Sequence, residues 1–211
     1  MKKMLIALVA ISTVLISCKG EKKEKVEAKE EVKVEKTVAL NNVDLSASLL
    51  NWKGTKPGGA HNGTAALKEG SLLVKKGEIV SGEFVIDMAS IKNLDIKDSK
   101  YGAKLVGHLT SADFFDVATY PTSKFVITSV DKKDDKLAVT GNLTIKDVTK
   151  SITIPASLTE VDGTPIFKSD TFNIDRADFN VKYGSKKFFD NLKDKFINDL
   201  VEMSFEVKLK S

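Results

Sequence analysis

A two-residue alternation near the C-terminus constrains the fold of this chain more than any other feature. Between residues 200 and 209, apolar side chains occupy every second position: Val201, Met203, Phe205, Val207 and Leu209. The residues between them are mostly polar. Because successive side chains of a strand point to opposite faces, this pattern predicts a strand with one buried face, as is typical of antiparallel sheets.

Seven further segments have the length and composition of strands, with less regular alternation. They are residues 43–52, 71–74, 79–88, 124–130, 137–145, 151–159 and 167–174. In the first of them, Val43, Leu45, Ala47 and Leu49 are expected to share the buried face. Polar turns such as Lys76-Gly77 and Asp134-Asp135 separate several of these segments. Eight such strands predict an all-β barrel or sandwich.

Two segments interrupt the strand pattern with helical spacing. Residues 99–115 place Leu105, Val106 and Leu109 on one helical face. Residues 186–196 do the same with their phenylalanines and Leu192. The sequence therefore predicts one or two short helices across a barrel end.

The N-terminus has the features of an export signal. Lys2 and Lys3 precede an apolar run over residues 4–16, which is too short to span a bilayer. Leu15-Ile16-Ser17-Cys18 resembles a lipobox, so residues 1–17 are expected to be a lipoprotein signal peptide and Cys18 to be lipidated. The alternative is an ordinary signal peptide with a chance cysteine. The expected location is the cell envelope, anchored by acylated Cys18 to the outer membrane, with the periplasmic or surface side open.

Residues 18–37 are almost wholly Lys and Glu, with isolated valines. Such a segment has no apolar face wide enough to offset the entropy of ordering. It is therefore expected to be a charged, flexible tether between the anchor and a folded domain over residues 38–211.

Composition disfavours several other classes of protein. Arg176 is the only arginine, and the remaining basic residues are lysines interspersed with acidic ones, so nucleic-acid binding is not expected. One cysteine excludes an internal disulfide, and two histidines make a structural metal site unexpected. No nucleophile, histidine and acid follow the order of a catalytic triad, and no cofactor motif is present.

Three motifs, in chain order, resemble the YceI-like family. They are residues 109–116 with Tyr120-Pro121 and Phe125, residues 141–150, and residues 174–179. The resemblance implies an eight-stranded, lipocalin-like antiparallel barrel around an apolar tunnel. It also implies binding of polyisoprenoids, including quinone-type or isoprenyl pyrophosphate lipids, outside the cytoplasm. Dimers are common in that family, so a homodimer is a further implication that no motif here tests.

This sequence departs from the usual family pattern in ways that leave the lipid head group open. Thr110 stands where a basic residue is common, and Asn180 follows Phe179 where the family usually has glycine. Only His61 is present in the opening region, where the family carries a longer histidine-containing motif.

The candidate ligand-binding residues are aromatic side chains able to line a tunnel and the few cationic or imidazole groups near them. They are Trp52, His61, His108, Phe114, Phe115, Phe125, Phe172, Arg176, Phe179 and Phe205. Arg176 has two readings: a clamp on a polar head group, or a buried ion pair with a carboxylate such as Asp113 or Asp178. His108 is equally suited to a ligand contact or a backbone contact.

Three functions fit these residues. The first is a non-catalytic carrier that holds an isoprenoid lipid inside the barrel. The second is a packed envelope barrel that acts through its outer surface. The third is a hydrolase using His108 or His61 beside a hydroxyl side chain.

Overall fold

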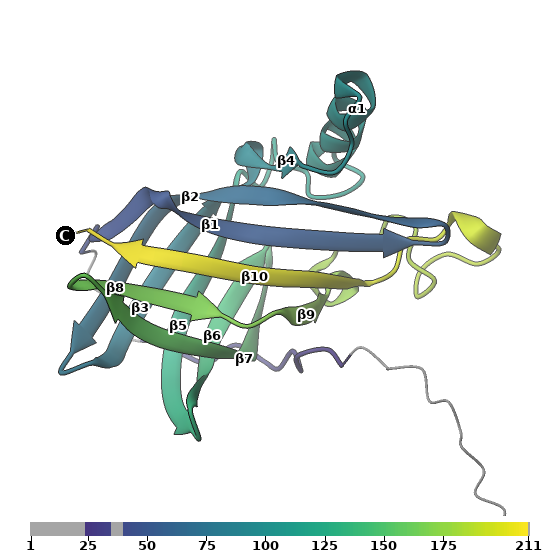
Figure 1. Cartoon of the computed structure of the whole chain (residues 1–211). Helices are drawn as coiled ribbons and strands as arrows, with labels where there is room; N and C mark the ends of the chain where they lie inside the picture. The colour runs from purple at the N-terminus through teal and green to yellow at the C-terminus, as the bar shows by residue number, and fades with distance from the viewer. Residues whose placement is uncertain (1–23, 35–39, 211) are drawn as a thin grey trace, which may run out of the picture.

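The computed structural model describes residues 24–34 and 40–210, and its main element is a ten-stranded antiparallel sheet. The strands are β1 (Val43–Lys56), β2 (Gly59–Lys75), β3 (Glu78–Asp87), β4 (Lys92–Asn93), β5 (Thr122–Lys133), β6 (Lys136–Ile145), β7 (Val148–Val161), β8 (Thr164–Ser169), β9 (Phe172–Asp175) and β10 (Leu200–Leu209). One α-helix, α1 (Ser99–Thr110), lies outside the sheet at one end (Figure 1). The 3₁₀ turns are η1 (Met88–Ser90), η2 (Arg176–Phe179) and η3 (Lys193–Lys195).

Eight of these strands close into a barrel. Their order is β1-β10-β8-β7-β6-β5-β3-β2, and β2 pairs back with β1. The short β9 follows β8 in the chain and pairs with β10, as β8 does. The two-residue β4 pairs with the first part of β2. All pairings are antiparallel, so the predicted eight-stranded, lipocalin-like antiparallel barrel is confirmed.

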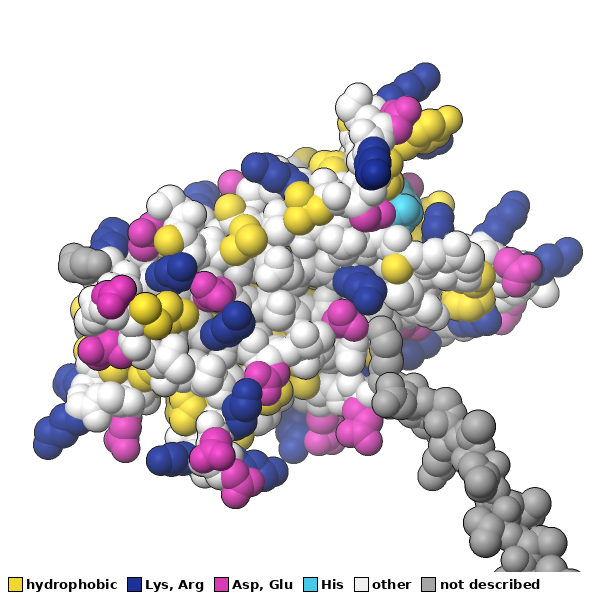
Figure 2. All heavy atoms as spheres, in the orientation of Figure 1, with side chains coloured by type: hydrophobic (Ala, Val, Ile, Leu, Met, Phe, Trp, Pro, Cys, Tyr) yellow, Lys and Arg dark blue, Asp and Glu magenta, His cyan; other side chains and the backbone are white. Residues whose placement is uncertain are grey.

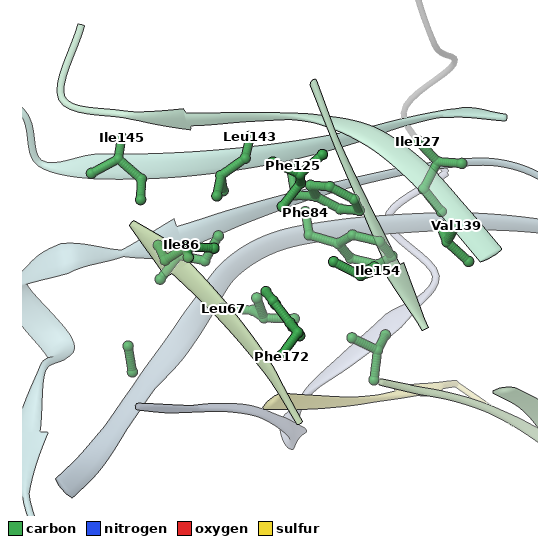
Figure 3. Close-up of a cluster of buried hydrophobic side chains, with 14 of the residues drawn as sticks. Leu67, Phe84, Ile86, Phe125, Ile127, Val139, Leu143, Ile145, Ile154 and Phe172 are labelled. Carbon is green, nitrogen blue, oxygen red and sulfur yellow. The ribbon is translucent and has the colours of Figure 1, made fainter. Parts of the chain in front are cut away.

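One half of the barrel is filled by aliphatic side chains. Leu72, Ile127 and Val139 are almost completely buried there, with Val43 closing the end. Figure 3 shows Ile127 and Val139 on one side of the phenylalanines and Leu143 and Ile145 on the other. The second half of the barrel is hollow, as described below.

The predicted strands correspond to β1, the end of β2, β3, β5, β6, β7, β8 with β9, and β10. The predicted face of the first strand is wrong, because a bulge shifts its register between Asp44 and Leu49. The Asp44 carboxylate accepts hydrogen bonds from the backbone N–H groups of Ser46 and Ala47 and so stabilises the bulge. Leu45 and Leu49 are consequently exposed, while Ser48 is buried.

Helix α1 confirms the first predicted helix, although it ends at Thr110 rather than Phe115. The second predicted helix, over residues 186–196, is wrong. Asn191 and Lys193 have positive φ angles of 60° and 46°, which an α-helix does not accept. This segment forms turns with the single 3₁₀ turn η3.

Residues 24–34, here called the N-terminal strap, lie against the barrel. Lys29 pairs with Ser151 at the start of β7, with N–O distances of 2.8 and 2.9 Å. The Val26 N–H donates to the Asn173 carbonyl of β9 at 2.8 Å. The side chains of Val26 and Ala28 pack on the hydrophobic core. The strap therefore fills the gap between the first half of β7 and β9.

The expectation of a solvated tether fails for residues 24–34. Val26 and Ala28 alternate with exposed Glu27 and Lys29, so the strap behaves as an irregular strand that needs only two small apolar contacts. Residues 18–23 and 35–37, including Cys18, lie outside the described residues.

The outer surface carries both signs of charge. Figure 2 shows Lys and Asp or Glu side chains interspersed over the face in view, with isolated apolar side chains between them. Within the described residues, no helix has the length and apolarity needed to cross a membrane.

Candidate functional site: an apolar cavity in the open half of the barrel

The hollow half of the barrel contains a cavity of about 260 Å³. Engineered apolar cavities of roughly 150 Å³ stay dry and bind molecules the size of benzene. The space in this barrel is therefore large enough for an apolar guest.

The two-residue alternation of the strands builds the wall of the cavity. Inward residues are separated by one position on β1, β2, β3, β6, β7, β9 and β10, so each of these strands contributes a pair or more of apolar side chains. The lining residues of this kind are Leu50, Trp52, Ala65, Leu67, Phe84, Ile86, Leu143, Ile145, Ile152, Ile154, Phe172, Ile174, Val201, Met203, Phe205 and Val207.

Aromatic packing forms the floor between the hollow and filled halves. Phe167 of β8 is completely buried, and its ring centroid lies 5.9 Å from that of Phe84 and 5.0 Å from that of Phe205. Phe84 and Phe205 line the cavity on their other sides. Phe125 lies over the backbone of Gly141, where a Cβ atom would come within 2.4 Å of its ring.

Helix α1 and the turn after it cover one side of the cavity. The Asp98 carboxylate caps the helix by accepting from the N–H groups of Lys100 and Tyr101. The helix directs Leu105, His108 and Leu109 to the cavity. Phe114 and Phe115 follow in the turn and also line it, with an edge-to-face contact at 5.0 Å between ring centroids.

Arg176 occupies the end of the cavity near the strap, and its side chain is almost completely buried. Its Nη1, Nη2 and Nε atoms donate to the carbonyls of Val181, Ile197 and Asn198 at 2.7, 3.0 and 3.2 Å. Nη2 lies 3.2 Å from Asp199 Oδ1, and the guanidinium sits 5.3 Å from the centroid of the Phe114 ring. Arg176 thus joins η2 to the segment that leads into β10.

The ion-pair reading of Arg176 is the one the geometry supports, although its partner is Asp199 rather than Asp113 or Asp178. Burial lowers the pKa of Arg176, against the opposing charges of Asp199 and Asp175. The guanidinium stays protonated because its ordinary pKa lies so far above neutral pH.

His108 has aromatic neighbours on two sides. The Tyr183 ring lies edge-on with its centroid 4.5 Å away, and the Phe114 ring lies at 5.8 Å. Its Nε2 atom is buried without a hydrogen-bond partner among the described residues. The structure therefore gives no support to a backbone contact by this nitrogen.

His61 and Trp52 lie on facing strands at the open end of the cavity. His61 belongs to β2, and its Nδ1 lies 2.9 Å from the Asp95 carboxylate. Trp52 donates its indole N–H to the Thr64 carbonyl at 3.3 Å. Each side chain thus presents ring carbons to the cavity while its polar atom has a protein partner.

All the candidate ligand-binding residues line the cavity except Phe179. Phe179 is completely buried, but it is absent from the cavity wall because η2 turns it into the core. Sequence reasoning missed the aliphatic majority of the lining, such as Leu67, Ile86 and Ile154. The alternation along the strands marks these aliphatic residues as inward-facing. It does not distinguish inward positions in the filled half from inward positions that border the cavity.

Among the described residues, no group of three or more His, Cys, Asp or Glu side chains has an arrangement suited to a metal ion. Within this part of the chain, neither histidine forms a hydrogen bond with a serine or threonine hydroxyl. Of the polar side chains at the cavity, Asn198 and Thr55 bond each other, and Trp52 and Arg176 bond backbone carbonyls.

A closed eight-stranded antiparallel barrel with an apolar interior cavity defines the class of small lipocalin-like barrels. The model of the YceI-like domain family matches residues 41–209. The chain therefore belongs to the YceI-like domain family. The strap lies before the matched region.

Known proteins show the same relationship. "Protein YceI" of Salmonella arizonae is 51% identical over 51 residues, which is 24% of this chain and 27% of that protein. The alignment thus spans about a quarter of this curated relative. BcnA of Burkholderia cenocepacia has a similar structure, with a TM-score of 0.63 and 26% identity over 80% of this chain and all of that one.

Two further solved structures share the fold. One is a polyisoprenoid binding domain from Saccharophagus degradans implicated in plant cell wall breakdown, with a TM-score of 0.59 and 18% identity over 81% of this chain and 97% of that one. The other is a YceI protein of Campylobacter jejuni, with a TM-score of 0.52 and 23% identity over 70% and 84% of the two chains.

Proposed function

We propose that this protein binds a long apolar isoprenoid-type lipid in the barrel cavity and carries, stores or protects it in the cell envelope. The observation that carries the proposal is the hollow half of the barrel, with a wall that is nearly all apolar. Each methylene moved from water into such a wall contributes about 0.8 kcal/mol. The polyisoprenoid binding domain of Saccharophagus degradans, which has the same fold, supports the choice of lipid class.

The cavity also weighs against the alternative of a packed barrel acting through its outer surface. In that alternative, inward residues would fill both halves as they fill the half around Leu72 and Val139. A catalytic role has less support still, because His61 contacts a carboxylate and His108 Nε2 has no hydroxyl partner in the described chain. We therefore propose a binding protein rather than an enzyme.

A matched pair of glycine substitutions tests the proposal. Gly54 lines the cavity and has open space around its Cβ position, so Gly54→Leu places a side chain at the open end without a clash. Gly59 belongs to the same hairpin, has open space, and does not line the cavity. Gly59→Leu is therefore the control.

The measurement is native mass spectrometry of the detergent-extracted full chain, followed by solvent extraction and lipid identification. We expect a stoichiometric isoprenoid on the wild type and Gly59→Leu, and at least tenfold less on Gly54→Leu. A wild-type protein that carries no lipid and takes up neither polyprenol nor quinone would refute the proposal.

We also propose that the chain is exported and anchored through acylated Cys18. The lipobox-like tetrad before Cys18 supports this. The mature N-terminal peptide should begin at Cys18 and carry the mass of a diacylglyceryl group. Cys18→Ser should abolish that mass and release the protein from membranes, whereas a peptide retaining residues 1–17 in the wild type would contradict the anchor.

A further inference from the structure

The long loop between β9 and β10 presents aromatic side chains to solvent that do not line the cavity. Its outer part, residues 182–196, is here called the β9–β10 tip. Tyr183, Phe188 and Phe189 are exposed on it, the two phenylalanines by 46% and 48%. Every other aromatic side chain in the described part of the chain is buried or half-buried, except Tyr101 on α1. The exposure of two neighbouring phenylalanines therefore needs a reason.

Backbone hydrogen bonds hold the β9–β10 tip in its shape. The Ile197 N–H donates to the Gly184 carbonyl at 2.9 Å and closes the base of the loop. The N–H groups of Phe188 and Phe189 both donate to the Ser185 carbonyl, at 3.2 and 3.0 Å. Ser185 is completely buried, and Gly184 has a φ of 63°, which glycine adopts without strain. The two phenylalanines are thus held in solvent by a bonded turn.

The tip projects from the barrel at the open end of the cavity. Figure 1 shows it in yellow beyond the β1–β2 hairpin, and the Asn198 N–H donates to the Thr55 carbonyl of that hairpin at 2.9 Å. Val181 and Ile197, which flank the tip, both line the cavity. Figure 2 shows lysine and hydrophobic side chains together at this projecting end. Whatever the tip contacts therefore lies beside the cavity.

The end of the barrel that bears the exposed rings also has an excess of positive charge. The tip contains five lysines and two aspartates. Lys187 is paired with Asp175, whereas the other four lysines have no ion-pair partner within the described residues. The turns at the opposite end, residues 75–78, 131–136 and 160–163, carry five lysines and six acidic residues. The positive charge is therefore particular to the tip.

Two of the unpaired lysines lie over phenylalanine rings of the tip. Lys182 Nζ lies 5.1 Å from the centroid of the Phe188 ring, and Lys186 Nζ lies 3.5 Å from that of the Phe196 ring. Such lysines cover ring surface with their aliphatic stems while the ammonium group stays in water. Exposed rings combined with unpaired lysines are typical of segments that lie in the head-group region of an anionic bilayer.

We infer that the β9–β10 tip docks on the surface of an anionic lipid bilayer. Phe188 and Phe189 enter the boundary between head groups and acyl chains, and the lysines lie beside the lipid phosphates. A projecting tip offers little area to a rigid protein partner, whereas a fluid lipid surface closes around it. The inference goes beyond the proposed lipid binding, because it does not depend on what the cavity holds.

Quenching of a tryptophan placed in the tip tests the inference. Trp52→Phe removes the only tryptophan, and Phe189→Trp then provides one reporter in the tip. Val80→Trp in the same background is the matched control, because Val80 is 54% exposed and follows the turn at residues 75–78. The full chain is reconstituted with phosphatidylcholine vesicles brominated in their acyl chains, with or without phosphatidylglycerol. The readout follows the tip itself, so an acylated Cys18 that holds the protein on the vesicle does not mask the result.

The expected result is deep, charge-dependent contact by the tip alone. With phosphatidylglycerol present, the tryptophan of Phe189→Trp should be quenched at least about threefold more strongly than that of Val80→Trp. Without phosphatidylglycerol, its quenching should fall toward the level of the control, because the lysines then have no anionic surface to approach.

A second pair of variants tests the lysines. Lys193 and Lys195 are exposed in the tip, and Lys193→Gln with Lys195→Gln should lower the ratio of docked to undocked tip by about fivefold for each lysine removed. Lys132→Gln with Lys133→Gln removes two exposed lysines at the opposite end and should leave that ratio within about twofold.

Three outcomes would overturn the inference. Equal quenching of the Phe189→Trp and Val80→Trp reporters on anionic vesicles would show that the tip stays in water. Equal quenching of Phe189→Trp with and without phosphatidylglycerol would remove the role of the lysines. A blue-shifted emission of Phe189→Trp without quenching by the brominated lipid would show that a protein chain, such as a second copy, covers the rings instead.

Discussion

The position of Arg176 requires an arginine rather than the lysine that this chain uses elsewhere, and the structure gives the reason. Its planar fork reaches three carbonyls and one carboxylate from a buried position, which an ammonium group cannot match in geometry. The sequence indicates that this position is special, since no other arginine occurs. It does not identify Asp199 as the partner, because that carboxylate approaches through a turn with no local signature.

Arg176→Met is expected to destabilise the protein strongly. It leaves Asp199 and three carbonyls without their donor, and removing one partner of a buried ion pair costs about 3–5 kcal/mol. Lys168→Met, in the exposed pair with Glu206, is the control and should cost less than about 1 kcal/mol. Urea unfolding of both variants checks this, and equal costs would show that the Arg176 cluster is replaceable.

Asp175 links three parts of the chain and is expected to make stability depend on pH. Burial opposes its charge, but the hydrogen bond and charge of Lys187, the Ala177 N–H and the charge of Lys25 together lower the pKa of Asp175 below 3.8. A lowered pKa in the folded state stabilises the fold above the ordinary pKa, and the effect is lost as pH falls through the folded-state value.

The wild type should therefore exceed Asp175→Asn in unfolding free energy by about 2 kcal/mol at pH 6. That difference should shrink as pH falls below 3.8. Urea unfolding at several pH values between 6 and 2.5 measures it. A difference that stays constant over this range would show that the carboxylate charge is not what matters.

At the scale of elements, the strap is where the sequence was most misleading. A run of Lys and Glu predicts a solvated segment, yet Val26 and Ala28 dock in a gap between β7 and β9. That gap arises because β8 pairs with only the second half of β7. No local sequence pattern predicts this partial pairing. The 186–196 segment failed for a related reason, since helical spacing of its phenylalanines says nothing about the positive φ angles that interrupt it.

Hydrogen exchange offers a sharp check on the strap. The amide hydrogens of Val26, Lys29 and Val32 are bonded to the Asn173 carbonyl, the Ser151 carbonyl and Asn142 Oδ1. These three should exchange slowly, while those of Glu27 and Glu31 should exchange at rates close to unstructured peptide.

Asn142 gives this check its control. Its side chain bonds both the N–H and the carbonyl of Val32, at 3.0 and 2.6 Å. Asn142→Ala should remove the protection of Val32 and leave that of Lys29 within about tenfold. Fast exchange at all three amides in the wild type would show that the strap is a free tether and does not dock on the barrel.

At the scale of the whole molecule, the alternation of apolar residues was sufficient to predict a closed antiparallel barrel, because inward positions on eight strands have few other arrangements. It was insufficient to predict which half would be hollow. Leu67 and Leu72 occupy the same strand and both point inward, but only Leu67 borders the cavity.

These two leucines make a matched pair for measuring the consequence. Leu72→Ala should cost about 3–5 kcal/mol, because it creates a void in a filled region. Leu67→Ala should cost about 1–2 kcal/mol less, because its side chain already borders empty space and makes fewer contacts to lose. Chemical denaturation of lipid-free protein compares them, and equal costs would contradict a division into filled and hollow halves.

The docking of the strap would also set how the barrel is oriented on a membrane if the proposed anchor is present. Lys25 contacts Asp175 and Asp178, next to Arg176 at the open end of the cavity. If Cys18 carries the proposed anchor, only five residues lie between it and Glu24, a reach of at most about 20 Å. The short linker would then hold the open end of the cavity toward the bilayer. A lipid could pass between the bilayer and the barrel with little exposure to water.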